Sequence, residues 1–282
     1  MQQTELLLRC KLLKGFGYQK LLQLAGCLPG KLNDLTLRQI LELDLPPGAE
    51  KAVRAAFSNR FDRTVARILC QCQVISYFDD IYPPQLREIY RPPLVLFAQG
   101  NLQLLQKEIV AIVGSRTPTE YSREVIQKIA PKLTKDNWVI ASGLAKGVDG
   151  LAHQAALEAG AGTIAVVGNG LNYYYPIQNR NLQEKIIKKG LLLSEYLPDT
   201  PPRPFRFPER NRIIAGLSQN LIVTEAKKHS GSLITANLAL DDNRNIYAVP
   251  GPISSPLSVG PNELIAAGAT PIVDLEMPLR NI

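Results

Sequence analysis

Apolar residues along this chain follow two different patterns, one in the first quarter and another in the rest. In residues 1–75, leucines recur at three-to-four-residue spacing among polar residues and are interrupted by glycine and proline. That spacing is the period of an amphipathic α-helix. The segments that show it are 5–13, 19–25, 37–43 and 48–69. We therefore predict a small all-helical N-terminal domain over residues 1–75.

The pattern of apolar residues changes between residues 74 and 100, where short apolar stretches are separated by prolines such as Pro83, Pro84 and Pro93. Proline cannot donate to a strand ladder and is excluded from central strands. This segment is therefore predicted to form an edge of the sheet, or to lead into it.

From residue 109 onward, continuous runs of Val, Ile and Leu alternate with glycine- or serine-rich loops and helical segments. The predicted strands are 109–113, 138–141, 163–167, 191–195, 220–224 and 245–249, with a further candidate at 270–273, and the clearest helices are 120–133, 151–159 and 232–240. Unbroken apolar runs are typical of strands buried on both faces. Strand–helix alternation favours a parallel sheet covered by helices on both sides. We predict an α/β fold, with a Rossmann-like domain and a mainly parallel sheet over residues 76–282.

The loops that leave these strands should gather at one edge of the sheet, where α/β proteins bind ligands. They contain many glycines and serines, together with Arg116, Lys146 and Lys227. Small residues let backbone amides approach an anion, and a following helix N-terminus adds partial positive charge. The pattern predicts a groove that binds phosphates.

Residues 203–212 hold four arginines and two phenylalanines beside one acidic residue. A second aromatic cluster at 173–175 is followed by Arg180. Arginine binds phosphate with two parallel hydrogen bonds, and aromatic rings stack on unpaired bases. Each cluster alone is also compatible with ordinary packing. Together with the basic loops they favour a site for a single-stranded nucleic acid.

Charge and composition narrow the function further. The chain has 32 Lys and Arg against 25 Asp and Glu, a net charge of +7 that favours anionic partners. It contains no apolar run of about eighteen residues and no secretory signal at its start, so we expect a cytoplasmic protein with no membrane partner. Four cysteines without nearby histidines are too few for a structural zinc site, and no metal is expected.

Signals for catalysis or a cofactor are weak. The segment Gly168-Asn169-Gly170 is no convincing dinucleotide fingerprint, because Tyr173 follows and the motif comes after the third predicted strand. Neither a phosphate-binding P-loop motif nor a Gly-x-Ser-x-Gly elbow occurs in the sequence. Asp149 and Glu225 are predicted to orient basic side chains rather than to act as an acid–base pair. We therefore predict no catalytic residues and no cofactor.

Several of these motifs occur together in the order found in one family. The chain resembles the DNA-processing protein A (DprA/Smf) family over about residues 75–275, through Ile112-Val113-Gly114-Ser115-Arg116, the segment 142–149, Tyr175-Pro176-x-x-Asn179, the segment 207–217, Ser230-Gly231-Ser232-Leu233-Ile234-Thr235 and Val249-Pro250-Gly251. The resemblance implies an extended Rossmann fold, binding of single-stranded DNA, loading of the RecA recombinase during natural transformation, and homodimerisation. It also implies that Arg116 belongs to the DNA-binding pocket.

The turn at 13–17, with a glycine on each side of Phe16, suits a helix-hairpin-helix motif whose backbone amides can face a phosphate; an ordinary tight helical turn fits the same residues at least as well. Three other features are interpreted through the resemblance. The helical N-terminal segment is similar to the sterile-alpha-motif-like domain of some members. Members carry a pocket lysine two residues after the Tyr-Pro pair, where this chain has Ile177 and Gln178, so Arg180 is the candidate replacement. Some members end in a winged-helix domain, which we do not expect in a chain that stops at Ile282.

The leading prediction is a single-stranded-DNA-binding protein and not an enzyme. Its predicted DNA-binding residues are Gly114, Ser115, Arg116, Lys146, Asn179, Arg180, Phe207, Arg210, Asn211, Arg212, Lys227, Ser230, Gly231 and Ser232. The alternative is an enzyme that binds a nucleotide or nucleoside monophosphate, such as a phosphoribohydrolase. Such enzymes usually show a Pro-Gly-Gly-x-Gly-Thr loop before a catalytic glutamate, and this sequence has no such loop.

Overall fold

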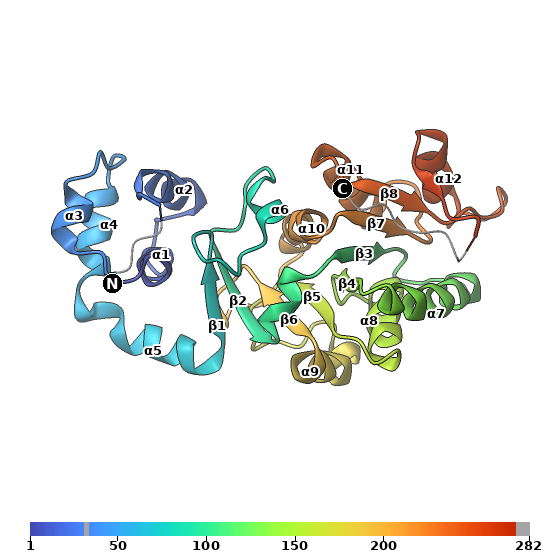
Figure 1. Ribbon diagram of the computed structural model, residues 1–282, viewed down its shortest axis with the longest axis horizontal. Helices are drawn as coiled ribbons and strands as arrows, with labels where there is room; N and C mark the ends of the chain where they lie inside the picture. The colour runs from blue at the N-terminus through green and yellow to red at the C-terminus, as the bar shows by residue number, and fades with distance from the viewer. Residues whose placement is uncertain (31–33, 275–282) are drawn as a thin grey trace.

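The computed structural model describes residues 1–30 and 34–274 (Figure 1). Residues 31–33 of the predicted helical domain and 275–282 of the predicted Rossmann-like domain lie outside this description. One sheet holds the strands in the order β1-β2-β6-β5-β4-β3-β7-β8-β9. The strands are β1 (Gln73–Ser76), β2 (Val95–Gly100), β3 (Ile109–Val113), β4 (Val139–Ser142), β5 (Thr163–Val167), β6 (Leu191–Ser194), β7 (Asn220–Val223), β8 (Asn245–Ala248) and β9 (Thr270–Pro271).

Helices surround this sheet on both sides. The α-helices are α1 (Gln3–Lys11), α2 (Tyr18–Cys27), α3 (Leu37–Leu41), α4 (Ala49–Ala56), α5 (Asp62–Gln71), α6 (Pro84–Arg87), α7 (Glu120–Lys135), α8 (Val148–Glu158), α9 (Arg180–Lys189), α10 (Arg206–Leu217), α11 (Gly231–Asp241) and α12 (Val259–Ala266). Short 3-10 helices are η1 (Asn59–Phe61), η2 (Leu102–Gln106) and η3 (Ile177–Asn179). None of the described helices is both long enough and apolar enough to span a membrane.

Strand direction agrees with the sequence analysis. From β6 to β9 every neighbouring pair is parallel, whereas β1 pairs with β2 and β2 pairs with β6 in antiparallel fashion. The α/β fold with a mainly parallel sheet is therefore confirmed. The proline-punctuated segment before residue 100 forms β1 at the edge of the sheet and β2 beside it, so the predicted sheet edge is confirmed.

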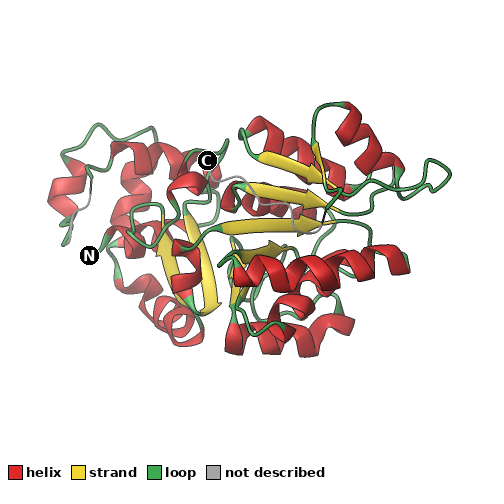
Figure 2. Ribbon diagram, turned by 45° about the vertical axis from the view of Figure 1, so that its right-hand side comes forward, coloured by secondary structure: helices red, strands yellow, loops and turns green. Residues whose placement is uncertain are grey.

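Successive residues of each strand point to opposite faces, and each face has its own helices. On β3, Ala111 and Val113 pack in a cluster with α10 and α11, while Val110 and Ile112 pack in another with α7 and α8. Figure 2 shows helices on both sides of the strands. Burial on both faces explains why the central strands read as continuous apolar runs.

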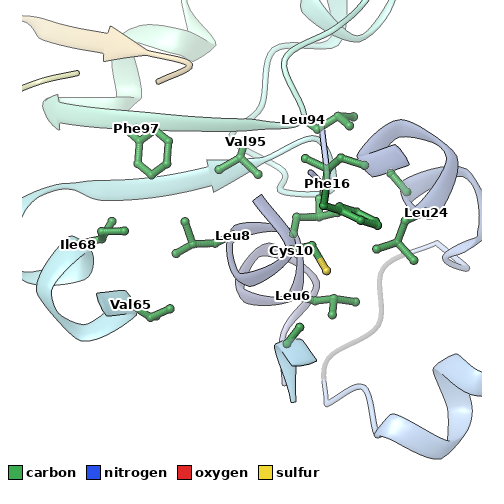
Figure 3. Close-up of a cluster of buried hydrophobic side chains, with 14 of the residues drawn as sticks. Leu6, Leu8, Cys10, Phe16, Leu24, Val65, Ile68, Leu94, Val95 and Phe97 are labelled. Carbon is green, nitrogen blue, oxygen red and sulfur yellow. The ribbon is translucent and has the colours of Figure 1, made fainter. Parts of the chain in front are cut away.

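The N-terminal helices join the edge of the sheet through a shared apolar cluster. Leu6 and Leu8 of α1 are fully buried in a cluster that also contains Ile68 of α5 and Val95 and Phe97 of β2 (Figure 3). Leu192 of β6 belongs to the same cluster. The division into two domains at residue 75 stays a prediction.

One predicted helix is wrong in extent. The segment 48–69 is not continuous, because α4 ends at Ala56 and α5 begins at Asp62. Ser58 lies in the break, where its hydroxyl donates to the carbonyl of Ala55 at 2.7 Å. Serine and asparagine compete with the helix for backbone hydrogen bonds. The break lets Val53 and Val65, on separate helices, reach the same apolar cluster.

A buried histidine links α8 to the sheet. His153 is fully buried, and its Nδ1 lies 2.8 Å from the Thr163 hydroxyl, which donates to the carbonyl oxygen of Ile140. Burial, together with the nearby charge of Arg210, lowers the pKa of His153 to about 3. The imidazole is therefore neutral in the folded protein at neutral pH.

This histidine predicts a pH dependence of stability. In the unfolded chain its pKa is close to the ordinary value of about 6.5, so the unfolded state takes up a proton first as the pH falls. The folded state should lose up to roughly 1.4 kcal/mol per pH unit between about pH 6.5 and pH 3 from this group. Urea unfolding at several pH values should show that the free energy of unfolding depends less steeply on pH in His153→Gln than in the wild type. Equal pH dependence in both proteins would contradict the conclusion that the folded protein keeps His153 neutral.

Candidate nucleic-acid interface

The best-formed candidate site lies where the strand order reverses. The chain runs from β3 outward through β4, β5 and β6, and then returns to place β7 on the other side of β3. The loops that follow β3 and β7 therefore diverge, which opens a crevice at the carboxyl ends of these strands. A pocket of about 400 Å³ occupies this position.

Most of the predicted DNA-binding residues line this pocket, which we call the switch-point pocket. Those that line it are Gly114, Ser115, Arg116, Phe207, Arg210, Asn211, Lys227, Ser230, Gly231 and Ser232. They come from the loops after β3 and β7, from the first two turns of α10 and from the start of α11. The structure thus brings Arg116 and the arginine-rich segment to one site, as the sequence analysis required.

The N-terminus of α11 opens into this pocket. Gly231 and Ser232 are its first residues, and Ser230 before them makes no side-chain cap to the helix. A Cβ atom at Gly231 would meet no atom within 4 Å, so this end of the helix is open. The Ser232 hydroxyl donates to the carbonyl of Gly114 at 2.7 Å, which ties the helix to the loop after β3. Helix N-termini of this kind bind anions through their free amides.

The loops after β3 and β4 touch each other beside the pocket. The amide of Val148 donates to the carbonyl of Ser115 at 3.0 Å. Gly147 has φ +76°, and a Cβ atom there would overlap the Ser115 carbonyl oxygen. Only glycine combines this backbone conformation with so close an approach. This contact fixes the loop that carries Arg116.

Arg210 and Asp149 hold the loop after β4 from two sides. Nη1 of Arg210 donates to the carbonyls of Gly143, at 2.5 Å, and Val166. Asp149 accepts from the amides of Gly143 at 3.2 Å and Ala145 at 3.3 Å. Both side chains are buried; burial raises the pKa of Asp149 and lowers that of Arg210 to about 10, while each charge opposes the shift of the other. Arg210 therefore holds in place the loop after β4, beside the pocket. Its direct contact with a phosphate stays a prediction.

Glu225 differs from its prediction. Its carboxylate accepts from the Thr119 amide at 2.8 Å and from the Thr119 hydroxyl at 2.6 Å, so it orients a threonine rather than a basic side chain. The contact spans the crevice from the end of β7 to the start of α7. Asp149 likewise bonds backbone amides, with Arg210 near enough to interact through its charge.

An aromatic pair lies at the pocket, which Phe207 lines directly and Tyr175 does not. The rings of Phe207 and Tyr175 are stacked, with centroids 5.1 Å apart and an angle of 24° between their planes. Tyr175 is 47% exposed, so part of the pair faces solvent. A stacked pair with an exposed face can extend its stack by a nucleobase.

Four predicted residues lie outside this pocket. Lys146 is exposed on the loop after β4, next to Ala145, which lines the pocket. Asn179 donates to the carbonyls of Leu144 and Ala145, both at 3.0 Å, and so supports that loop.

The other two are engaged elsewhere. Arg180 forms an exposed ion pair with Glu184 at 3.1 Å and lies 4.8 Å from the ring centroid of Tyr174. Arg212 pairs with Glu195 at 2.6 Å on the opposite side of α10. DNA contact by any of the predicted residues stays a prediction.

The electrostatics of the pocket favour an anion. Arg116 and Lys227 are exposed, and within residues 1–30 and 34–274 neither forms an ion pair with a carboxylate. Asp149 lines the pocket but is buried and hydrogen-bonded to amides. Two free cations beside an open helix N-terminus give the crevice a positive potential.

The sequence analysis missed two hydroxyl residues of the pocket, Thr117 and Thr235. Thr235 follows Gly231 by one helical turn, and its hydroxyl donates to the Gly231 carbonyl at 3.2 Å. The spacing of four residues on a helix that begins at the pocket could have indicated it.

Comparison with known proteins identifies the family of this chain. Residues 73–282 match the sequence model of the family described as DNA recombination-mediator protein A. DNA processing protein DprA of Bacillus subtilis is 44% identical over 207 residues, which cover 71% of this chain and 70% of the relative.

Two solved structures are similar along much of the chain. The X-ray structure of DNA processing protein A from Streptococcus pneumoniae has a TM-score of 0.83 and 36% identity, and the match covers 99% of this chain and 100% of that one. A structure of DNA processing protein A from Helicobacter pylori, which concerns the single-stranded DNA binding mode of that protein, has a TM-score of 0.67 and 34% identity over 73% of this chain and 93% of that one. The chain therefore belongs to the DNA recombination-mediator protein A (DprA/Smf) family.

Proposed function

We propose that this protein binds single-stranded DNA in the switch-point pocket. The observation that carries the proposal is the convergence of three features on one crevice. These are the open N-terminus of α11, the charges of Arg116 and Lys227, which form no ion pair among the described residues, and the ring of Phe207, which lines the crevice and stacks on Tyr175. The first two suit phosphates and the third suits a base. The single-stranded DNA binding of the Helicobacter pylori relative supports the same conclusion.

Recognition should depend little on base sequence. The polar groups at the pocket, namely backbone amides, hydroxyls and guanidinium groups, contact phosphates and do not read base edges. Stacking tolerates every base, because each has a π-face. Binding should therefore be strongly salt-dependent and nearly equal for different homopolymers.

The wider role that we propose follows from family membership. The protein would load the RecA recombinase onto incoming single-stranded DNA during natural transformation, and it would act as a homodimer. A pocket that holds the strand by its phosphates leaves base edges free for pairing in a recombinase filament. The test is to follow RecA filament assembly on protein-coated single strands, which should be faster with the protein present than without it.

We propose binding rather than catalysis at this site. The carboxylate that lines the pocket, Asp149, is buried and bonded to amides, and Glu225 is held by Thr119. Neither is free to act as a general base on a bound nucleotide without losing these bonds. The rival function, hydrolysis of a nucleoside monophosphate, needs such a group.

A length titration separates the two functions. Oligo-dT of increasing length should bind saturably, with an affinity that grows with length as more phosphates are contacted. Nucleoside monophosphates should bind weakly and remain unchanged on incubation. Turnover of a monophosphate, or an affinity independent of oligonucleotide length, would contradict the proposal.

A further inference from the structure

A second pocket lies on the other side of α10, between the N-terminal helices and the loop that follows β6. Its volume is about 530 Å³, within the range of pockets that hold small ligands. Its lining includes the basic and aromatic residues Lys11, Tyr18, Arg91, Tyr196, Arg206 and Arg212. We call this the inter-helical pocket.

Positive charge exceeds negative charge in this pocket. Lys11, Arg91, Arg206 and Arg212 line it together with two acidic residues, Glu195 and Glu209. Glu195 pairs with Arg212 at 2.6 Å, and Glu209 accepts from the hydroxyl of Tyr196 at 2.7 Å. Lys11 and Arg91 are left without a carboxylate partner among the described residues.

Two cationic side chains here, those of Lys11 and Arg212, are half-buried without full compensation. Burial lowers the pKa of Lys11, although Glu195 nearby favours its charged form. Nη1 of Arg212 is buried and has no hydrogen-bond partner in the described part of the chain. A buried cationic donor without a partner is costly, so an anion that enters the pocket would be stabilised by accepting from it.

The same pocket offers aromatic and guanidinium planes. The guanidinium of Arg91 lies 4.8 Å from the ring centroid of Tyr18, and that of Arg206 lies 5.0 Å from the ring centroid of Tyr196. Arginine planes and aromatic rings both stack on unpaired bases. Gly17, which also lines the pocket, precedes α2 and makes no side-chain cap, so the helix presents its first amides on this side.

The two pockets are separated only by the start of α10. Pro208 is exposed and lines both of them. Phe207 and Asn211 face the switch-point pocket, whereas Arg206 and Arg212 face the inter-helical pocket. A strand held in the first pocket can therefore reach the second by crossing Pro208.

We infer that the inter-helical pocket is a second nucleotide subsite, which binds a phosphate and a base of the same single strand after it crosses Pro208. The inference rests on the proposed function. It gives the turn before α2 and the N-terminal helices a part in DNA binding. The shared chemistry is that of a nucleotide, so a free nucleotide is the other source of ligand that the test must separate.

The test compares a short and a long oligo-dT on the full-length protein. The short one is chosen from the length titration as the length just sufficient for binding that depends on Arg116. Arg91→Gln and Lys11→Gln should each weaken binding of the long oligonucleotide roughly tenfold at low salt and reduce its log–log salt slope by about 0.7. Both variants should bind the short oligonucleotide as tightly as the wild type does.

Controls make each result decisive. Lys107→Gln removes one positive charge from an exposed position outside both pockets and should change neither oligonucleotide. A 5-iodouracil placed along the long oligonucleotide should photocrosslink to Tyr18 or Tyr196, and thymidine monophosphate should not compete for that crosslink.

Three outcomes would overturn the inference. These are unchanged long-oligonucleotide binding in both variants, equal losses for the two lengths, and efficient competition by the monophosphate. If no oligonucleotide length shows binding that depends on Arg116, the proposed function itself fails. If Arg116→Ala weakens both lengths while the two glutamine variants do nothing, only the second subsite fails.

Discussion

Replacement of Arg116 by alanine is expected to weaken binding of oligo-dT by about tenfold or more at low salt. Arg116 is exposed at the rim of the switch-point pocket, beside the open N-terminus of α11, and has no competing carboxylate in the described structure. The slope of log affinity against log salt should fall by roughly 0.7, the value for one phosphate contact on a single strand. Fluorescence anisotropy at several salt concentrations measures both quantities.

The matched control is Arg63→Ala, which removes the same charge from an exposed position on α5 outside both pockets. It changes the net charge of the protein equally, so any general field effect appears in both variants. Only the Arg116 variant should show a smaller slope of log affinity against log salt. An Arg116→Ala protein with wild-type affinity and slope would remove this arginine from the binding site.

Replacement of Arg210 by methionine is expected to destabilise the fold by about 3–5 kcal/mol, the cost of leaving a buried charge uncompensated. Asp149 would lose its nearest compensating cation, and the carbonyls of Gly143 and Val166 would lose their donor. Methionine fills a similar volume and adds no charge, so the loss reports on polar compensation rather than on a cavity. Urea unfolding at pH 7 measures the change.

Arg203→Met is the control for this second prediction. Arg203 belongs to the same arginine-rich segment but is exposed, so its replacement should change the free energy of unfolding by less than about 0.5 kcal/mol. Equal stability of the Arg210 and Arg203 variants would show that the loop after β4 does not depend on the buried guanidinium.

The sheet could be predicted because its sequence signal is local. Strands β3 (Ile109–Val113) and β5 (Thr163–Val167) occur at the predicted bounds. Each is buried on both faces, which imposes an unbroken apolar run, and each is followed by glycine. The order of strands and helices then places the glycine-rich loops after β3 and β7 at one crevice.

The roles of individual charged residues could not be predicted, because they depend on distant partners. Arg210 and Arg212 are two positions apart on α10 and looked equivalent in the sequence. One points under the switch-point pocket to the carbonyl of Gly143, whereas the other pairs with Glu195 on the opposite side. Nothing local distinguishes them, since both contacts join segments far apart in the chain.

The inter-helical pocket escaped prediction for a similar reason. Its residues come from α1, α2, the segment before β2, the loop after β6 and α10, which only the folded chain brings together. The sequence did single out the turn at 13–17 as a possible phosphate contact, from its two glycines. It did not show that Arg91 and Arg212 would lie beside that turn.

A crystal structure of the full-length protein with a short oligo-dT tests the central claim most directly. We predict a phosphate within hydrogen-bond distance of the amides of Gly231 and Ser232 and of the Arg116 guanidinium, with a thymine stacked against the Phe207–Tyr175 pair. A strand bound on another surface, with the crevice between the loops of β3 and β7 empty, would contradict it.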